Sequence, residues 1–152
     1  MTKLAKILSL IATCFIQSAY AAVYYVTPDG TGAGTSWSDA TTLAGANGKV
    51  ATGDTIRMKA GTYMMTARVD IKKPITIEGG YKGEVDDDLT LADVPETVLE
   101  GGYKDSASPT EAIWVENGSG TNYFYRLTFK RFYRRGFFKR GMRRLKCMTA
   151  DS

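Results

Sequence analysis

The sequence predicts an all-β fold, a parallel β-helix in which short strands stack along one axis. A six-residue motif occurs twice, as Ile77-Glu78-Gly79-Gly80-Tyr81-Lys82 and Leu99-Glu100-Gly101-Gly102-Tyr103-Lys104, 22 residues apart and with five of six positions identical. Each copy begins with β-favouring residues and then reaches a Gly-Gly pair, which can turn the chain without steric cost. A repeat this short cannot bury its apolar residues alone, so neighbouring copies must stack at about the 4.8 Å strand spacing.

We expect residues 1–21 to be a signal peptide. Two lysines precede an apolar run from Ile7 to Ile16, and Ala19-Tyr20-Ala21 has the small-x-small pattern of a signal peptidase site. The run is shorter than the roughly 20 apolar residues that a transmembrane helix needs, so we expect no membrane span. The chain is therefore predicted to be exported. Cleavage would leave Cys147 as the only cysteine, so no disulfide framework is predicted.

Charge divides the remaining chain into two parts. Residues 22–125 contain 15 acidic and 8 basic residues, a net charge of −7, whereas residues 126–146 contain 10 basic residues and no acidic one. We expect residues 22–132 to form an N-terminal cap and the coils of the β-helix. Residues 133–152 are predicted to be a basic tail, either disordered or encoded in a shifted reading frame, because so abrupt a change in charge marks a functional tail or a stretch outside the fold.

The cap is predicted to combine one strand and one short helix. Residues 23–26 are β-prone and are followed by the turn residues Pro28-Asp29-Gly30. Residues 38–50 are expected to hold a helix with Ser38 or Asp39 as its N-cap, because apolar residues recur at helical spacing at Leu43, Ala46 and Val50.

The coils are predicted from regular apolar positions. Ile56, Ile77 and Leu99 follow one another at intervals of 21 and 22 residues, so we expect them in one inward-facing column. Burying each of them is worth about 1.5–3 kcal/mol. Beyond Leu99, residues 112–115 and 125–129 are strand-like and would belong to a longer coil, which gives about four coils in all.

The order of these segments resembles the N-terminal part of exported right-handed parallel β-helix proteins. These are pectate-lyase-like proteins of bacterial envelopes, including those similar to polymorphic outer membrane proteins. The resemblance covers Val23 to Phe132 and rests on Tyr24-Tyr25-Val26-Thr27-Pro28, Gly32, Gly34-Thr35-Ser36-Trp37, Gly53-Asp54-Thr55-Ile56, Ala60-Gly61-Thr62-Tyr63, Ile75-Thr76-Ile77-Glu78-Gly79-Gly80-Tyr81 and Thr97-Val98-Leu99-Glu100-Gly101.

The resemblance implies a right-handed β-helix but no particular activity, because the same cap precedes lyases, adhesins and proteins without a known role. Members of this family continue for many Gly-rich coils. After Phe132 this chain instead becomes rich in arginine, so we expect it to be a truncated fragment.

The repeated motif also supplies candidate carbohydrate-binding residues. Tyr81 and Tyr103 are expected to stack on the outer surface, where aromatic rings can lie against sugars, or they simply cover the turn. Glu78 and Glu100 would form a matching column of carboxylates that could act as an acid and a base with separated pKa values. Alternatively, Lys82 and Lys104 neutralise them on a solvated face.

An acidic run offers the one candidate metal site. Asp86, Asp87 and Asp88 carry oxygen ligands of the kind that calcium prefers, and calcium-dependent lyases of the resembling fold use acidic clusters, although three consecutive residues do not easily face one ion. The chain has no histidine, which excludes histidine-activated nucleophiles and histidine metal ligands. No catalytic residue is predicted.

The leading functional prediction is an exported scaffold or adhesin-like protein of the cell envelope, at the surface, in the outer membrane or outside the cell. Its expected partner is a surface polysaccharide or a host or envelope component. The alternative is a fragment of a polysaccharide lyase or glycoside hydrolase. The tail interleaves aromatic and basic residues, a composition that can bind nucleic acid, anionic lipid or acidic polysaccharide. We do not expect a nucleic-acid partner.

Overall fold

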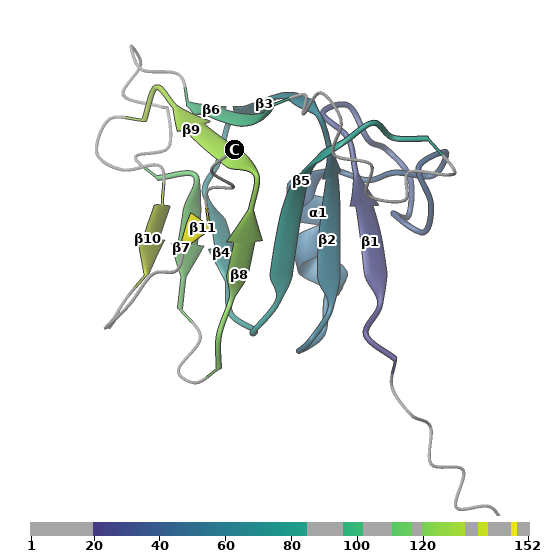
Figure 1. Ribbon diagram of the computed structural model, residues 1–152, viewed down its shortest axis with the longest axis horizontal. Helices are drawn as coiled ribbons and strands as arrows, with labels where there is room; N and C mark the ends of the chain where they lie inside the picture. Colours follow the sequence, from purple (N-terminus) through teal and green to yellow (C-terminus); the bar gives the residue numbers. More distant parts are fainter. Residues whose placement is uncertain are drawn as a thin grey trace, which may run out of the picture.

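The computed structural model describes residues 20–84, 96–101, 111–116, 120–132, 137–139 and 147–148. These residues are mostly β-strand, and every pairing between the named strands is parallel (Figure 1), in agreement with the predicted all-β class. The elements are β1 (Val23–Val26), α1 (Leu43–Lys49), β2 (Thr55–Lys59), β3 (Gly61–Met65), β4 (Val69–Ile71), β5 (Thr76–Tyr81), β6 (Thr97–Gly101), β7 (Ile113–Val115), β8 (Tyr123–Tyr125), β9 (Leu127–Lys130), β10 (Phe137–Lys139) and β11 (Cys147–Met148).

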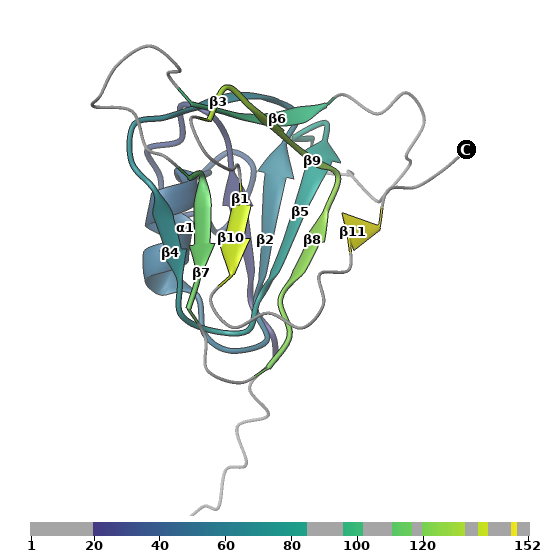
Figure 2. The ribbon, with the colours of Figure 1, turned by 90° about the vertical axis from the view of Figure 1, so that its left-hand side faces the viewer.

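The strands form three sheets that the chain visits in turn. A five-stranded sheet has the order β1-β2-β5-β8-β11, and two three-stranded sheets contain β3-β6-β9 and β4-β7-β10. We call these the five-stranded sheet, the β3 sheet and the β4 sheet. After β4 the chain returns to place β5 beside β2, and the next strands join β3 and β4 (Figure 2). Each round of the chain therefore adds one strand to each sheet.

Part of the expected basic tail continues this pattern. Residues Phe137–Lys139 pair with Ile113–Val115 as strand β10, and Cys147–Met148 pair with Phe124 and Tyr125 as strand β11. These short strands join the β4 sheet and the five-stranded sheet, respectively.

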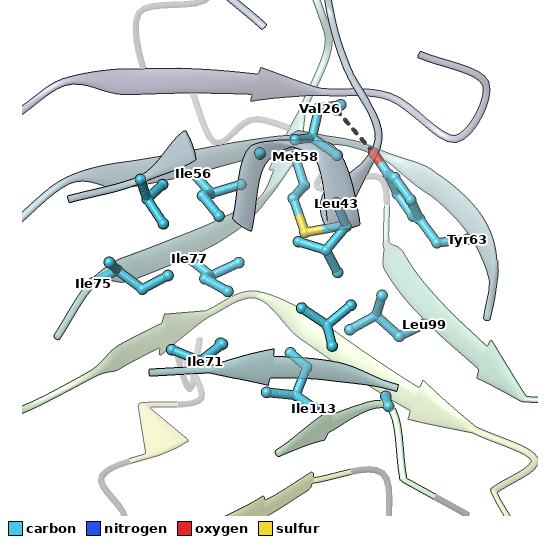
Figure 3. Close-up of a cluster of buried hydrophobic side chains, with 14 of the residues drawn as sticks. Val26, Leu43, Ile56, Met58, Tyr63, Ile71, Ile75, Ile77, Leu99 and Ile113 are labelled. Carbon is cyan, nitrogen blue, oxygen red and sulfur yellow. Dashed lines mark hydrogen bonds between the residues drawn. The ribbon is translucent and has the colours of Figure 1, made fainter. Parts of the chain in front are cut away.

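Apolar side chains from all three sheets meet in a shared core (Figure 3). Ile56 on β2 lies in register with Ile77 on β5, and Ile77 lies in register with Phe124 on β8. Ile56 and Ile77 are fully buried, which confirms that these two residues stack in one inward column. The burial of each contributes about 1.5–3 kcal/mol, so this stack is a main source of stability.

The placement of Leu99 in the same column is wrong. Leu99 lies in the β3 sheet, in register with Tyr63 on one side and Phe129 on the other. The first copy of the six-residue motif lies on β5, and the described residues of the second copy, Leu99–Gly101, lie on β6. These are successive strands of one round rather than equivalent strands of successive rounds. The 22-residue interval therefore measures the step from one sheet to the next.

The Gly-Gly pair of the first copy forms a bulge and not the predicted sharp turn. Glu78 pairs with Arg57 and Tyr81 pairs with Lys59, so β5 carries one extra residue over this interval. Gly80 adopts a φ of 84°, a conformation that favours glycine at such a bulge. Gly79 is required for a different reason, because a side chain there would collide with the carbonyl oxygen of Arg126.

The second copy of the motif also has a glycine packed tightly against the backbone of the next round. A side chain at Gly101 would come within 2.8 Å of the carbonyl oxygen of Arg131. Arg126 and Arg131 both have positive φ, 55° and 58°, and each directly follows a strand. Arg126 thus divides the predicted strand over residues 125–129 into β8 and β9. In both sheets, therefore, a glycine of the motif leaves room for the backbone of a positive-φ arginine in the next round.

Helix α1 packs against the first round of strands. Leu43 and Ala46 are buried in the core, and the helix contacts β1, β2 and β4. A helix is present within the predicted range of residues 38–50, but it begins only at Leu43. Its N-cap is neither Ser38 nor Asp39: the Thr42 side chain accepts a 3.0 Å hydrogen bond from the Gly45 amide. Asp39 instead bonds to the preceding loop. Within the described part of the chain, no helix has both the length and the apolar character needed to cross a membrane.

Candidate binding face on the five-stranded sheet

Four side chains form a row across the outer face of the five-stranded sheet. Tyr25, Arg57, Glu78 and Tyr125 occupy matching positions on β1, β2, β5 and β8, four strands that lie side by side in Figure 1. Their neighbours along the strands, such as Ile56 and Ile77, are buried in the core, so alternation directs the row outward. Three strand spacings give the row a length of about 14 Å.

Aromatic rings frame both ends of this row. Beside β1, Trp37 packs edge-on against Tyr25, with ring centroids 4.9 Å apart and an interplanar angle of 68°. At the other end, Tyr123 and Tyr125 lie nearly parallel, with centroids 6.2 Å apart and an angle of 5°. Tyr123 is 45% exposed, and Tyr25, Trp37 and Tyr125 are half-buried. The face thus presents partly exposed aromatic surface on either side of two charged groups. We call Tyr25, Trp37, Arg57, Glu78, Tyr123 and Tyr125 together the aromatic row.

Tyr81 does not lie on the outer surface as predicted. Its side chain is only 2% exposed, and Trp37 packs against its ring with centroids 5.7 Å apart. The guanidinium carbons of Arg57 and Arg126 lie 5.3 Å and 5.1 Å from the ring centroid. Tyr81 therefore points to the same face as Lys59, its partner on β2, but Trp37, Arg57 and Arg126 cover its ring, so it cannot itself stack on a sugar. Tyr103, its predicted partner, lies outside the described residues.

The Tyr81 hydroxyl has a specific partner in the row. It donates a 2.6 Å hydrogen bond to Oε2 of Glu78. Burial of the phenol, together with this bond to a carboxylate, raises the pKa of Tyr81 to about 12. Glu78 also pairs with Arg57, whose Nε lies 3.7 Å from the same carboxylate oxygen. Tyr81 and Arg57 therefore both hold the carboxylate of Glu78 in place.

The predicted column of Glu78 and Glu100 does not form. Glu78 is on β5 in the five-stranded sheet, whereas Glu100 is on β6 in the β3 sheet. Glu100 pairs with Arg131 at 2.9 Å. The acid-and-base pair that the repeat suggested is therefore excluded by topology. In the described structure Glu78 forms an ion pair with Arg57 and not with Lys82, and Glu100 forms one with Arg131, whereas Lys104 lies outside the described residues.

Cations outnumber carboxylates on this face. Arg57 and Lys59 both point outward from β2, and Arg126 follows β8, whereas Glu78 is the single carboxylate among the described residues of β1, β2, β5 and β8. The Nε atoms of Arg57 and Arg126 are enclosed and have no hydrogen-bond partner in the described structure. Residues 22–125 carry a net negative charge, so this local excess of positive charge does not follow from composition.

The loop before α1 fixes Trp37. The carboxylate of Asp39 accepts a 3.1 Å hydrogen bond from the Ala33 amide and a 2.8 Å bond from the Thr35 hydroxyl. These bonds lower the pKa of Asp39 below its ordinary value. The Tyr25 amide also donates to the carbonyl of Gly34 at 2.9 Å, which ties the loop to β1. These hydrogen bonds fix the loop that carries Trp37 and so hold its ring against the sheet.

Sequence reasoning missed most of the aromatic row. Tyr25 could have been identified by its alternation with Val26, which is fully buried. Arg57 could have been identified in the same way, since it lies between Ile56 and Met58 in the sequence. No local signal marked Trp37, or Arg126 beside the row, because Trp37 reaches the face from a loop and Arg126 from a corner.

The predicted calcium site cannot be placed, because Asp86, Asp87 and Asp88 lie outside the described residues. Over the ranges that the structure does describe, no group of three or more acidic or cysteine side chains is arranged to hold a metal ion.

A hollow of about 400 Å³ lies between α1 and β4. Its polar groups are largely engaged: Arg68 pairs with Asp70 at 2.6 Å, and the Lys73 ammonium donates to the Val50 carbonyl at 2.6 Å. The aromatic row is the better candidate site, because its aromatic surface is partly exposed. Comparison of the chain with protein-family models, curated proteins and solved structures finds no match.

Proposed function

We propose that this chain is an exported cell-envelope protein built as a right-handed parallel β-helix. In this proposal it serves as a scaffold or adhesin-like surface that contacts carbohydrate, with a surface polysaccharide or a host or envelope component as its partner. The signal-like residues 1–21 support export. The return of each round to the same three parallel sheets supports the β-helix.

The observation that carries the proposed contact with carbohydrate is the aromatic row. Sugar rings have apolar faces that pack on aromatic side chains, and hydroxyl groups around their edges that need hydrogen-bond partners. Tyr25 and Tyr125 flank Arg57 and Glu78 in one register row, so aromatic surface and polar groups alternate along it. An extended saccharide lying across the strands would meet both kinds of group.

The same residues favour binding over catalysis. Cleavage of a glycosidic bond by two carboxylates needs both of them on opposite sides of the bond. The described part of the row contains one carboxylate, Glu78, which already accepts a hydrogen bond from Tyr81 and pairs with Arg57. This arrangement supports a scaffold in which Glu78 orients its neighbours.

Trp37 provides the test. In a Trp114→Phe variant, Trp37 is the single tryptophan and reports on the row. We expect its fluorescence to change saturably when the full chain is titrated with short neutral or acidic oligosaccharides. A Tyr125→Ala variant should weaken this response, whereas Met64→Ala, an exposed change in the β3 sheet, should not. If no saccharide alters the signal, the proposed contact with carbohydrate is wrong.

A further inference from the structure

Asp54 is a buried carboxylate that lacks a cation. Its side chain is 5% exposed. Oδ2 accepts a 2.7 Å hydrogen bond from the Ala51 amide, and Oδ1 accepts a 2.8 Å bond from the Ala22 amide. Within the described ranges, no lysine or arginine forms an ion pair with it. A buried carboxylate held by neutral donors alone is an unfavourable arrangement, because its charge is removed from water without an opposite charge nearby.

A second hydrogen bond, to the carbonyl group of Ala22, also fixes this residue beside Asp54. The Thr55 amide donates a 2.9 Å hydrogen bond to the Ala22 carbonyl, which extends the ladder between β1 and β2 by one step. The preceding residues differ: Ala21 is exposed, and Tyr20 is 92% exposed. The peptide bond between Ala21 and Ala22 therefore marks the boundary between exposed chain and chain fixed to the fold.

The peptide bond between Ala21 and Ala22 is also the predicted cleavage site, because it directly follows Ala19-Tyr20-Ala21. We propose that removal of the leader places a new α-ammonium group on Ala22 that forms an ion pair with Asp54 and locks strand β1 to β2. The inference rests on the export that we propose above. Its new content is a structural role for the processed end of the chain.

The chemistry is peptide hydrolysis by a leader-removing protease. Water adds to the carbonyl carbon of Ala21 and the bond to the Ala22 nitrogen breaks. The oxygen of the water remains on Ala21 as part of a carboxylate, and protons pass to the Ala22 nitrogen. An α-amino group has an ordinary pKa of about 7.7–8.0, so it is mostly protonated at neutral pH. A neutral amide donor is thereby replaced by a cation with three donors at the same place.

The exchange strengthens a contact that already exists. Hydrogen bonds between charged groups are roughly twice as strong as those between neutral groups. Before cleavage, β1 is tied to Asp54 by a single amide, and after cleavage it is tied by a charge pair shielded from water. The processed chain should therefore hold β1 more firmly than the precursor does, which makes the final fold a product of export.

One inserted residue tests this without removing any charge. The full chain is produced with its own leader in an exporting host, and a second version carries one Gly between Ala21 and Ala22. Cleavage after Ala21 then leaves an ammonium in both proteins, but in the second it is displaced from Asp54 by one residue. We expect the protein that begins at Ala22 to melt about 5 °C higher. Asp54→Asn should abolish the difference, whereas Asp70→Asn, a change to an exposed carboxylate, should preserve it.

A second measurement covers the case in which Asp54→Asn fails to fold. The α-amino group should react with cyanate about tenfold more slowly in the protein that begins at Ala22 than in the version extended by Gly, because an ammonium held in an ion pair gives up its proton less readily. Equal melting temperatures together with equal reaction rates would overturn the ion pair and leave export intact. N-terminal sequencing that gives a first residue other than Ala22 would overturn the cleavage site as well.

Discussion

The hydroxyl of Tyr81 donates a 2.6 Å hydrogen bond to Glu78, across the bulge that the intervening glycines form in β5. This bond links a buried ring to the one carboxylate of the aromatic row. It also explains why the repeated motif places a tyrosine three residues after a glutamate in its first copy. The tyrosine fixes the carboxylate and does not present its own ring to solvent.

Stability should fall at alkaline pH through Tyr81. The folded pKa of about 12 lies above the ordinary tyrosine value of 10.0, so ionisation of the phenol favours the unfolded chain. The stabilisation is complete below pH 10 and is lost as the pH rises towards 12. Denaturant unfolding of Tyr81→Phe should therefore show a shallower alkaline decline than the parent protein. Tyr63, whose pKa burial also raises, should account for part of the decline that remains.

Gly79→Ala should be strongly destabilising. An added methyl group would meet the carbonyl oxygen of Arg126 and lie 2.7 Å from Cβ of Thr97. Overpacking of this kind costs about 1–3 kcal/mol, measurable by urea unfolding. Gly48→Ala is the matched control, because nothing lies within 4 Å of a side chain there and alanine favours the helix by up to about 1 kcal/mol. Equal effects of the two changes would contradict the proposed close packing at Gly79.

The loop that carries Trp37 should loosen in acid. Hydrogen bonds from Ala33 and Thr35 lower the pKa of Asp39 below 3.8. The ionised carboxylate thus stabilises the loop at pH values above 3.8, and the stabilisation is lost as the pH falls through the lower folded value. In the Trp114→Phe background, Trp37 fluorescence should shift over this acidic range. Asp39→Asn should produce much of the same shift at neutral pH, and an unchanged spectrum in that variant would argue against the role of Asp39.

Arg126→Asn should separate binding from folding. Asparagine tolerates positive φ better than arginine does, so the corner after β8 should persist. The cation over Tyr81 would be lost, and binding of an acidic oligosaccharide should weaken about tenfold in the fluorescence titration.

Arg131→Asn is the control for this change. It removes the same charge at a corner of the same kind, but beside Glu100 in the β3 sheet. Its binding should match that of the parent chain. If both variants lose affinity equally, the interaction depends on overall charge and not on the aromatic row.

The strand class and part of the core could be predicted because they depend on local pattern. The alternation around Ile56 and Ile77 places both residues inward wherever the strands lie, and the structure pairs them. Helix α1 was predicted from the spacing of its apolar residues. Its N-cap was missed because Asp39 and Thr42 are both suitable capping residues, and only the hydrogen bonds from Ala33 and Thr35 show which of them belongs to the loop.

The position of Leu99 could not be predicted from its spacing. An interval of 22 residues fits equally well a step between successive rounds and a step between successive strands of one round. The deciding quantity is the length of chain between β5 and β6, which is not fixed by the motif. The burial of Tyr81 was missed for a related reason. The bulge keeps Tyr81 on the outer face, in register with Lys59, and its ring is buried because Trp37 and Arg126 cover it from distant parts of the sequence.

The order of strands within each sheet has a consequence for assembly. From β2 onward in the five-stranded sheet, each strand that follows pairs with one that comes earlier in the chain, and the same holds in the other two sheets. Helix α1 packs on the first round, whereas Phe124, Phe129 and Phe132 in the last rounds are half-buried. A chain that emerges from a membrane N-terminus first could therefore fold vectorially, with each completed round acting as the template on which the next is laid down.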